Sequence, residues 1–536
     1  MSAEPSAARS RRALLALPVL AGLGAACTNP GGGGPPPTTT PAPTTPPGPG
    51  GPPSAVPPEV AVDKLTFGPK PGLVDAVRAM GVGAWIEQQL SPTAVPDAEA
   101  RLAGYRSLAN TNYQNYLLAD SGEWDLIPAE LDAATIIRAV HSERQLYELM
   151  CDFWANHFNT WRSKTWMGFL KNADHRDVVR AHALGKFSHM LMASAHSPAM
   201  LDYLDNLPND ASTPGGVNQN YARELMELHS LGIVNGVQVH TEEDVAQLSK
   251  LISGWSIDWE VGPNKFGFRF APWMHSLDAV SILDGAYTRP ARSYGEGYDD
   301  GREFINLLAH HPATARHICW KLCKRFIGDD PPMSLVDSAA SVFSANDTAI
   351  VPTLRHIFNS PEFAAASDSK IRRPFEHVIA CLRALGATFG TDPEGKSMKS
   401  LRWVLDDMGQ PIFERVSPDG YPDAGAYWIS SAALLERWGF TGEVARNAFG
   451  YRNTTDRVDV NLAALMPNPL PATVTELISW IGANVGSISL PGADIADLCN
   501  AIGYSGSAAA STLTSNASKL ALCVGLVLCH PLFQRR

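Results

Sequence analysis

The chain has 536 residues, 45% of them hydrophobic, which is enough to build one large or two ordinary globular domains. Its formal net charge of -11 argues against nucleic-acid binding, because such proteins present clustered positive charge. The 13 tryptophans suit either a core or a surface that stacks against sugars, and their number does not decide between the two.

Residues 1–27 have the pattern of an export signal. Arg11 and Arg12 precede an apolar run over residues 13–26, which is too short to span a bilayer comfortably. The paired arginines resemble a twin-arginine signal. Because twin-arginine export carries folded proteins, often with a cofactor already inserted, this pattern favours a cofactor slightly.

Cys27 is the candidate lipid attachment point. It follows three small residues and resembles the first residue of a mature bacterial lipoprotein, although Gly24 stands where such sites usually carry leucine. The alternative is ordinary cleavage nearby. Residues 28–58 are nearly all Gly, Pro, Thr and Ala, so we expect a disordered tether. These features predict an exported protein, either anchored to the extracytoplasmic face of the membrane through a lipid on Cys27 or secreted.

Residues 59–536 are predicted to form a mostly α fold, a large multi-helix single domain. Apolar side chains recur at helical spacing along this region, with no fixed repeat and no βαβ alternation. Residues 260–298 are the least helical stretch, and their alternating phenylalanines predict a small β-hairpin. The apolar run over residues 520–528 is too short to cross a membrane and predicts a buried C-terminal helix.

A long helix, or a broken pair of helices, is predicted over residues 128–158. Its apolar stripe follows the helical period and includes His157. Glu148, Asp152 and Asn156 form a neighbouring polar row at four-residue spacing. His157 is either a buried residue bonded to the backbone or part of a functional site, and the sequence leaves both open.

A carboxylate lies on the apolar face of the next predicted helix, in the segment NQNYARELMELHSLG. Glu224 falls three residues after Tyr221 and four before Leu228, and Glu227 and His229 flank the stripe. A buried carboxylate must find a partner or change its pKa, because an isolated buried charge costs several kcal/mol or more. The partner of Glu224 is therefore the main question that the sequence raises.

The segment HICWKLCKRF predicts a helix with two faces. Cys319 and Cys323 are four residues apart, and we expect small apolar core residues there rather than a pair of metal ligands. In an exported protein Cys499 could form a disulfide with one of the two cysteines that follow it. The basic residues of the segment are predicted to form a solvated face: His317, Lys321, Lys324 and Arg325.

Nine segments together resemble a large bacterial family of exported proteins known only as domain of unknown function 1800. They span about residues 60 to 536 and are LTFGPKPGLVDAVRAMGVGAWIEQQL, FWANHFNT, SPAMLDYLDN, NQNYARELMELHSLG, EDVAQLSKLISGW, HHPATARHICWKLCKRFIGDDPP, RRPFEHVIACLRALG, GQPIFERVSPDGYP and FQRR. The resemblance implies an exported, mostly helical protein and carries no established activity.

Two positions depart from the family pattern. Ser276 follows His275 where the family has Asp, so the role of that Asp is absent here or taken over by Asp278. Gln219 stands where the family usually has Glu. If those carboxylates are catalytic in relatives, this chain is altered or inactive.

The candidate site gathers histidines and carboxylates from several predicted helices. The candidate metal ligands, for a divalent ion held between helices, are His157, Glu224, His229 and His275. The candidate catalytic groups are Glu224, Glu227, His157 and, as an anion anchor, Arg223. Their spacing matches no recognised metal motif, so a metal site, a metal-free acid–base site and a purely structural polar network all stay open.

These observations leave two hypotheses for function. The first is an exported enzyme that hydrolyses an envelope or extracellular polymer, and the second is a non-catalytic surface protein that binds polysaccharide or an envelope partner. The departures at Gln219 and Ser276 favour the second slightly. Five tryptophans could line a sugar-binding groove, although each also suits the core: Trp161, Trp166, Trp255, Trp259 and Trp273.

Overall fold

The computed structural model describes residues 56–536, apart from 165–166, 215 and 451–455. The predicted signal over 1–27, its candidate lipid attachment point Cys27 and all but the last residues of the predicted tether (28–58) lie outside the described residues. Trp166 lies outside them as well.

Helices dominate the described residues, which confirms the mostly α prediction. The N-terminal helices are α1 (Pro58–Leu65), α2 (Leu73–Met80), α3 (Val82–Leu90), α4 (Asn112–Leu118), α5 (Leu126–His141), α6 (Gln145–His157), α7 (Lys171–Asp174), α8 (Phe187–Ala195) and α9 (Pro198–Tyr203). The middle helices are α10 (Asn220–Glu224), the π-helical turn η7 (Leu225–His229), α11 (Glu242–Leu251), α12 (Tyr298–His310), α13 (Pro312–Phe326), α14 (Met333–Ala345), α15 (Ile350–Phe358) and α16 (Pro361–Ala364). The last are α17 (Pro374–Ala384), α18 (Lys396–Asp407), α19 (Ser431–Ala445), α20 (Leu462–Leu465), α21 (Val474–Ile481), α22 (Gly492–Ile502), α23 (Ala510–Thr514) and α24 (Ala517–Cys529).

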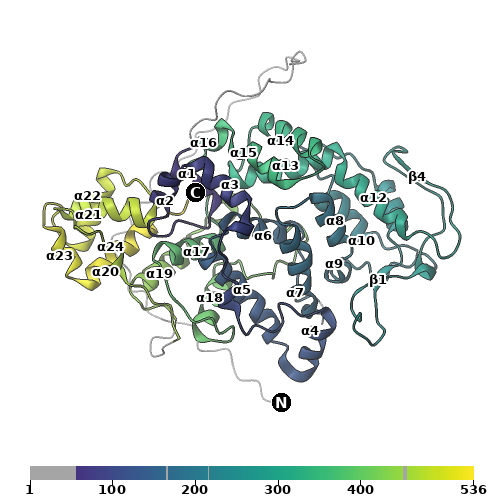
Figure 1. The fold of residues 1–536 in the computed structure, drawn as a ribbon, viewed down its shortest axis with the longest axis horizontal. Helices are drawn as coiled ribbons and strands as arrows, with labels where there is room; N and C mark the ends of the chain where they lie inside the picture. The colour runs from purple at the N-terminus through teal and green to yellow at the C-terminus, as the bar shows by residue number, and fades with distance from the viewer. Residues whose placement is uncertain (1–55, 165–166, 215, 451–455) are drawn as a thin grey trace, which may run out of the picture.

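The predicted β excursion consists of two short antiparallel pairs. Strand β1 (Trp255–Ile257) pairs with β2 (Phe268–Phe270), and β3 (Val280–Ile282) pairs with β4 (Tyr287–Arg289). The excursion therefore begins at β1, slightly before the predicted residue 260. In Figure 1 these strands lie at one end of the molecule, α21 to α24 lie at the other, and α5 and α6 lie between them.

The region predicted as a long helix or a broken pair is a broken pair. Helix α5 ends because Ser142 takes an extended conformation, with φ -65° and ψ 137°. The side-chain amide of Gln145 then donates to the carbonyls of Ala139 and Ser142 at 3.0 and 2.8 Å. These bonds satisfy carbonyls that the helix end leaves free, and α6 begins at once.

One large cluster of buried apolar side chains extends from Ala61 to Phe533 and joins α1 to α24. Cys319 and Cys323 are fully buried in it, as predicted. The seven described cysteines are free thiols, so the predicted disulfide at Cys499 is wrong for this structure. No helix among residues 56–536 that the structure describes is long and apolar enough to cross a membrane. Helix α24 is instead a buried C-terminal helix, as predicted.

A buried carboxylate on α17 collects three arginines from distant parts of the chain. The Oε1 atom of Glu376 lies 2.5 Å from Arg325, 3.4 Å from Arg373 and 3.4 Å from Arg536. Burial alone would raise the pKa of the Glu376 carboxyl, but the charges of Arg325 and Arg373 overcome it and lower the pKa to about 2. Glu376 therefore neutralises guanidinium groups that are almost completely buried.

Replacing Glu376 with glutamine should destabilise the fold by about 3–5 kcal/mol at pH 7, because it leaves buried guanidinium charges without their counter-ion. Since the folded pKa is about 2 and the ordinary value is 4.5, this contribution is complete above pH 4.5 and is lost as the pH falls toward 2. Urea unfolding at several pH values measures it. Glu436→Gln, at an exposed position on α19, is the control. Equal free energies of unfolding for the two variants at pH 7 would contradict the assignment.

Candidate functional site

The helix that carries Glu224 and His229 changes its winding between them. Helix α10 ends at Glu224, and the chain continues as the π-helical turn η7 to His229. The wider turn carries His229 into the core, where it is fully buried, while Glu224 stays half-buried. The Ser230 hydroxyl donates to the carbonyl of Leu225 at 2.6 Å and closes the turn. Such π-turns occur frequently at functional sites.

Two histidines from other elements satisfy the carbonyls at the end of this turn. His157 Nε2, at the end of α6, lies 3.2 Å from the carbonyl oxygen of His229. His317 Nδ1, on α13, lies 2.8 Å from the carbonyl oxygen of Ser230. Because carbonyls only accept, each of these nitrogens carries a hydrogen. A Cβ on Gly232 would lie 2.3 Å from the His317 ring, so glycine is required beside it.

The second ring nitrogen of His157, Nδ1, accepts a hydrogen bond from a lysine. Lys321 Nζ, on α13, lies 2.8 Å from His157 Nδ1, which is unprotonated because Nε2 holds the hydrogen. Burial lowers the pKa of the Lys321 ammonium to about 8, although the charges of Asp423 and Asp419 oppose this shift. Lys321 is therefore mostly protonated at pH 7, yet it releases its proton far more readily than a lysine in water.

The lysine lines a pocket of about 270 Å³, which we name the Lys321 pocket. Its lining residues come from α6, from α13, from Arg373 at the start of α17 and from the loop after α18: Phe153, Asn156, His157, Trp320, Lys321, Lys324, Arg325, Arg373, Asp419, Tyr421, Pro422 and Asp423. The pocket therefore brings together three of the segments that carry the family resemblance. Arg373 comes from a fourth, RRPFEHVIACLRALG.

The histidines at this site are neutral. Burial lowers the pKa of His229 to about 3 and that of His317 to about 4, and it lowers the pKa of His157 well below its ordinary value. The positive charge of Lys321 adds to each shift. Neither ring nitrogen of His229 has a hydrogen-bond partner among the described residues. His157 therefore serves as a neutral acceptor that holds Lys321 in place.

Glu224 does not line the Lys321 pocket, but the charge of one pocket residue reaches it. Burial raises the pKa of its carboxyl, Glu227 and Asp419 raise it further, and Arg223 opposes them. Asp419 lines the Lys321 pocket and also acts on Lys321. Within the described part of the chain, Glu224 forms no ion pair. Asp419 therefore acts on both groups, and the pKa of Glu224 is raised while that of Lys321 is lowered.

The other predicted site residues lie apart from this arrangement. Arg223 forms a surface pair with Glu242, with two N–O distances of 2.6 Å, so its charge is already matched. Glu227 is half-buried on the neighbouring face. His275 Nδ1 donates to the carbonyl of Ser253 at 2.8 Å, and its ring packs against Phe270.

The four candidate metal ligands are only partly brought together. The rings of His157 and His229 lie with their centroids 6.1 Å apart, but no contact joins either ring to Glu224 or His275 in the described structure. Across residues 56–536, masked positions aside, no group of three or more His, Cys, Asp or Glu side chains is placed to hold a metal ion. Of the four candidate ligands, the described structure therefore brings together only His157 and His229.

The two positions that depart from the family pattern, Gln219 and Ser276, do not line the Lys321 pocket. Gln219 is an exposed residue that immediately precedes α10. Ser276 is buried, and its backbone N–H donates to the Ser253 hydroxyl at 2.9 Å. Asp278 is 68% exposed and pairs with Lys250 at 3.1 Å, so it does not occupy the buried place at Ser276.

The prediction of a solvated basic face on α13 is wrong. His317 is 7% exposed and Arg325 1% exposed, while Lys321 and Lys324 are half-buried in the pocket wall. His317, Lys321 and Arg325 follow one another at four-residue spacing, so they lie on one helix face. That spacing of a histidine, a lysine and an arginine is the signal from which Lys321 could have been found.

The loop between α18 and α19 closes the site. The side-chain amide of Asn156 donates to the carbonyl of Tyr421 at 2.9 Å and accepts from its N–H at 2.7 Å. Asn159 donates to two further loop carbonyls, those of Arg415 and Ser417. Gly420 has φ +76°, and a Cβ there would lie 2.3 Å from the backbone oxygen of Asn156. The close approach of the loop to α6 therefore requires glycine.

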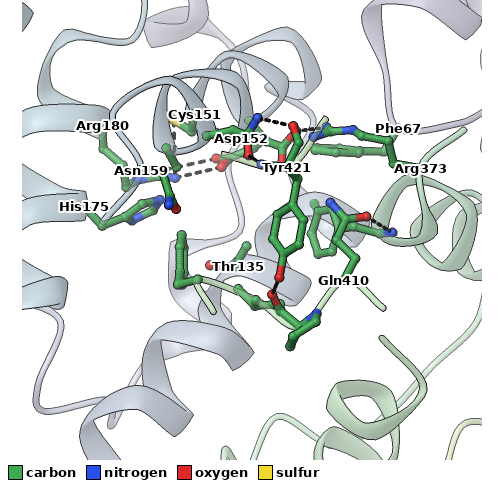
Figure 2. Close-up of a pocket in the computed structure, with 18 residues that line it drawn as sticks. Phe67, Thr135, Cys151, Asp152, Asn159, His175, Arg180, Arg373, Gln410 and Tyr421 are labelled. Carbon is green, nitrogen blue, oxygen red and sulfur yellow. Dashed lines mark hydrogen bonds and ion pairs between the residues drawn. The ribbon is translucent and has the colours of Figure 1, made fainter. Parts of the chain in front are cut away.

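The predicted polar row of α6 lines a smaller cavity of about 60 Å³, the inner chamber, drawn in Figure 2. Glu148 pairs with Arg180 at 2.7 Å, and Asp152 pairs with Arg373. Figure 2 shows the ring of Tyr421 crossing the view of the chamber between Thr135 and Gln410, with its hydroxyl bonded to a loop carbonyl. The polar row is thus satisfied by ion pairs and by the loop.

The inner chamber lies directly behind the Lys321 pocket. Three residues line both cavities: Asn156, Arg373 and Tyr421. Because the amide pair between Asn156 and Tyr421 and the ion pair between Arg373 and Asp152 are both formed, these residues make a closed wall between the two cavities.

The candidate sugar-stacking tryptophans divide between core and surface. Trp255 is fully buried, and Trp161 is half-buried with its indole N–H bonded to Glu414 at 2.9 Å. Trp259 and Trp273 are each 51% exposed beside the β1–β2 pair. They do not line the Lys321 pocket.

These features define a mostly α-helical protein with a lysine–histidine pair in a polar pocket closed by a loop. The chain belongs to the family described as Protein of unknown function (DUF1800), whose sequence model matches residues 60–535. The resemblance read from the nine segments is therefore confirmed. Searches of curated proteins and of solved structures found no match.

Replacing Gly420 with alanine should detach the loop from α6. Both Gly420 and Gly409 have a positive φ, of +76° and +81°, but a Cβ at Gly409 would meet nothing within 4 Å. Gly409→Ala should therefore cost about 1 kcal/mol for the backbone conformation alone. Gly420→Ala should cost about 1–3 kcal/mol more, because a backbone atom must move. Urea unfolding of both variants measures the difference, and equal losses would show that the loop does not depend on this contact.

Proposed function

We propose that this protein is an exported hydrolase that acts on an envelope or extracellular polymer through a metal-free acid–base site in the Lys321 pocket. The observation that carries the proposal is the 2.8 Å contact between Lys321 Nζ and His157 Nδ1 in a pocket, with the pKa of Lys321 lowered to about 8. Perturbed titratable groups that meet in a cavity are the usual mark of an active site.

Glu224 and Lys321 have the shifts that an acid–base pair requires. Opposite environments raise the pKa of one group and lower that of the other, which brings both closer to neutral pH. In this proposal the ionised Glu224 is the general base, Lys321 is the general acid and His157 positions Lys321. Arg223 and Glu227 adjust the charge around Glu224 and do not touch the substrate.

The reaction is the hydrolysis of a C–O bond that links two units of the polymer. Glu224 takes a proton from water as the water oxygen attacks the carbon of that bond. The bond from this carbon to the leaving oxygen breaks, and the Lys321 ammonium gives its proton to that oxygen. Proton transfer through water from Glu224 back to Lys321 restores the starting state.

The test is a hydrolysis assay of the full-length protein on a panel of cell-wall glycans, extracellular polysaccharides and polyesters. Lys321→Met should lower kcat by about 100-fold or more, because it removes the general acid. Since the protonated form is active, the rate of the unmodified protein should fall above about pH 8. Lys321→Arg keeps the pocket charge but cannot release its proton, so it should lose activity much as Lys321→Met does, which separates proton donation from positive charge.

The matched control for these variants is Lys519→Met, on α24 outside the pocket. It should leave kcat and the pH profile unchanged. Hydrolysis that is equally fast in Lys321→Met and in the unmodified protein would exclude the proposed site. A polymer that binds without being cleaved under any condition would favour the second candidate function.

That second candidate is a non-catalytic protein that binds polysaccharide. It is supported by Trp259 and Trp273, whose exposed rings offer flat apolar surface of the kind that stacks on sugars. Loss of polysaccharide binding in Trp259→Ala and Trp273→Ala, with no hydrolysis by the unmodified protein, would support this function over the first.

We also propose that the protein is exported through its twin-arginine signal and anchored by a lipid on Cys27. In bacteria supplied with an alkyne-labelled fatty acid, the full-length protein should take up the label, and Cys27→Ser should take up none. Replacing Arg11 and Arg12 with lysine should leave the protein inside the cell. The control Lys519→Arg should not impair export. Labelling of Cys27→Ser equal to that of the unmodified protein would contradict the anchor.

A further inference from the structure

The Lys321 pocket carries a positive charge that the rest of the chain does not share. The whole chain has a net charge of -11. In the pocket wall, however, four basic side chains face two acidic ones: Lys321, Lys324, Arg325 and Arg373 against Asp419 and Asp423. An acidic protein with a basic cavity attracts anions to that cavity in particular.

The acidic side chains near the pocket are already engaged elsewhere. Asp423 lies 2.9 Å from Lys370, which lines no part of the pocket. Glu376, behind the wall, is shared among three arginines. Asp419 lies 3.8 Å from Arg415 on its own loop. Asp419 and Asp423 act on the charge of Lys321, but neither forms an ion pair with a pocket lysine among the described residues.

Two of the pocket ammonium groups have no carboxylate partner. Among the described residues, neither Lys321 nor Lys324 takes part in an ion pair. Lys321 is held by the neutral ring of His157, and Lys324 lies over the ring of Trp320, 5.0 Å from its centroid. Both ammonium groups are thus positioned by uncharged neighbours and keep their charge for a ligand.

Arg325 adds positive charge behind these lysines. It is 1% exposed, and none of its three guanidinium nitrogens makes a hydrogen bond of good geometry to a described residue. Its ion pair with Glu376 is its neutralising contact, and Glu376 is shared. Because Glu376 neutralises Arg325, and Asp152 and Glu376 neutralise Arg373, the positive charge available to a ligand is that of Lys321 and Lys324.

The remaining wall is aromatic. Phe153, Trp320 and Tyr421 line the pocket together with the lysines. Flat apolar rings beside donors suit a sugar ring, whose faces are apolar and whose substituents are polar. The cavity of about 270 Å³ is large enough for a single such unit rather than for a folded partner.

We propose that the Lys321 pocket recognises an acidic sugar unit, one that bears a carboxylate or a phosphate, and that Lys324 binds this anionic group. The inference rests on the proposed hydrolase function and names its substrate class: an acidic polysaccharide of the envelope or of the extracellular matrix. Lys321 is left to act on the linking oxygen, and Trp320 contacts the ring.

The test measures the binding of three probes of similar size by titration calorimetry at low salt: tri-galacturonate, a neutral galactose trisaccharide and a trisaccharide that carries one phosphate. At least one acidic probe should bind at least tenfold more tightly than the neutral one. Preference for tri-galacturonate alone identifies a carboxylate as the recognised group, and preference for the phosphorylated probe alone identifies a phosphate. Added salt should weaken the preference, because it screens the ion pair.

Lys324→Met should reduce the affinity for the preferred acidic probe at least tenfold and leave the weak affinity for the neutral probe unchanged. Lys324→Arg should largely restore it, since the charge returns. Lys519→Met is the matched control and should change neither affinity. Equal binding of the acidic and neutral probes, or an unchanged affinity in Lys324→Met, would overturn the inference.

This result separates the inference from the proposed function. Tight acidic binding that depends on Lys324, without cleavage of any polymer, would uphold the anion site and overturn the hydrolase. Cleavage of a neutral polymer that depends on Lys321, without acidic preference, would uphold the hydrolase and overturn the anion site. Binding measured in Lys321→Met keeps the two apart, because that variant lacks the general acid but retains Lys324.

Discussion

The pocket depends on how the chain ends one helix. The turn η7 stops in the protein interior, where its last carbonyls have no water to bond. His157 and His317 supply the missing N–H groups from α6 and α13. A requirement of the backbone thus joins three distant segments at one point and fixes the tautomer of each ring. The free lone pair on His157 Nδ1, which receives Lys321, follows from that tautomer.

The same burial decides the charge state of the site. Neutral imidazoles can be buried at low cost, so the histidines give up their protons, whereas Lys321 keeps its proton at pH 7 with a lowered pKa. Behind them, the buried arginines are held by Glu376, whose pKa they lower, and Arg373 also pairs with Asp152. The wall of the pocket is therefore a network of paired charges in which, among the described residues, Lys321 and Lys324 have no carboxylate partner.

Local sequence patterns predicted helix α6 and the burial of His157, but they did not predict that Lys321 lines the pocket. The apolar stripe of α6, which includes His157, and its polar row follow from the sequence, because each depends on residues within a few turns. The sequence left a long helix and a broken pair both open over residues 128–158 and did not predict the position of the break. Lys321 was assigned to solvent because HICWKLCKRF alone presents a basic face. That face is covered by the loop that holds Gly420 and Tyr421, far along the chain, and a helical period carries no information about such a cover. The sequence also did not predict where Glu224 and His229 lie relative to each other. Their five-residue separation spans a π-turn, which the regular helical period does not predict.

The sequence did not show which group is the partner of Glu224, the carboxylate on the apolar stripe. Its neighbour Arg223 points away to Glu242, because consecutive helix residues face in different directions. Glu224 is left half-buried beside Glu227 and within reach of the charge of Asp419, which raises its pKa. A half-buried carboxylate beside another acidic residue lowers the stability of the fold, and an apolar residue at position 224 would pack without that cost. Departures from local consistency of this kind are expected where a site does chemistry, and Asp419 acts both on Glu224 and on Lys321, whose pKa shifts in the opposite direction. The opposed shifts across Asp419 therefore argue for an acid–base function more strongly than either group does alone.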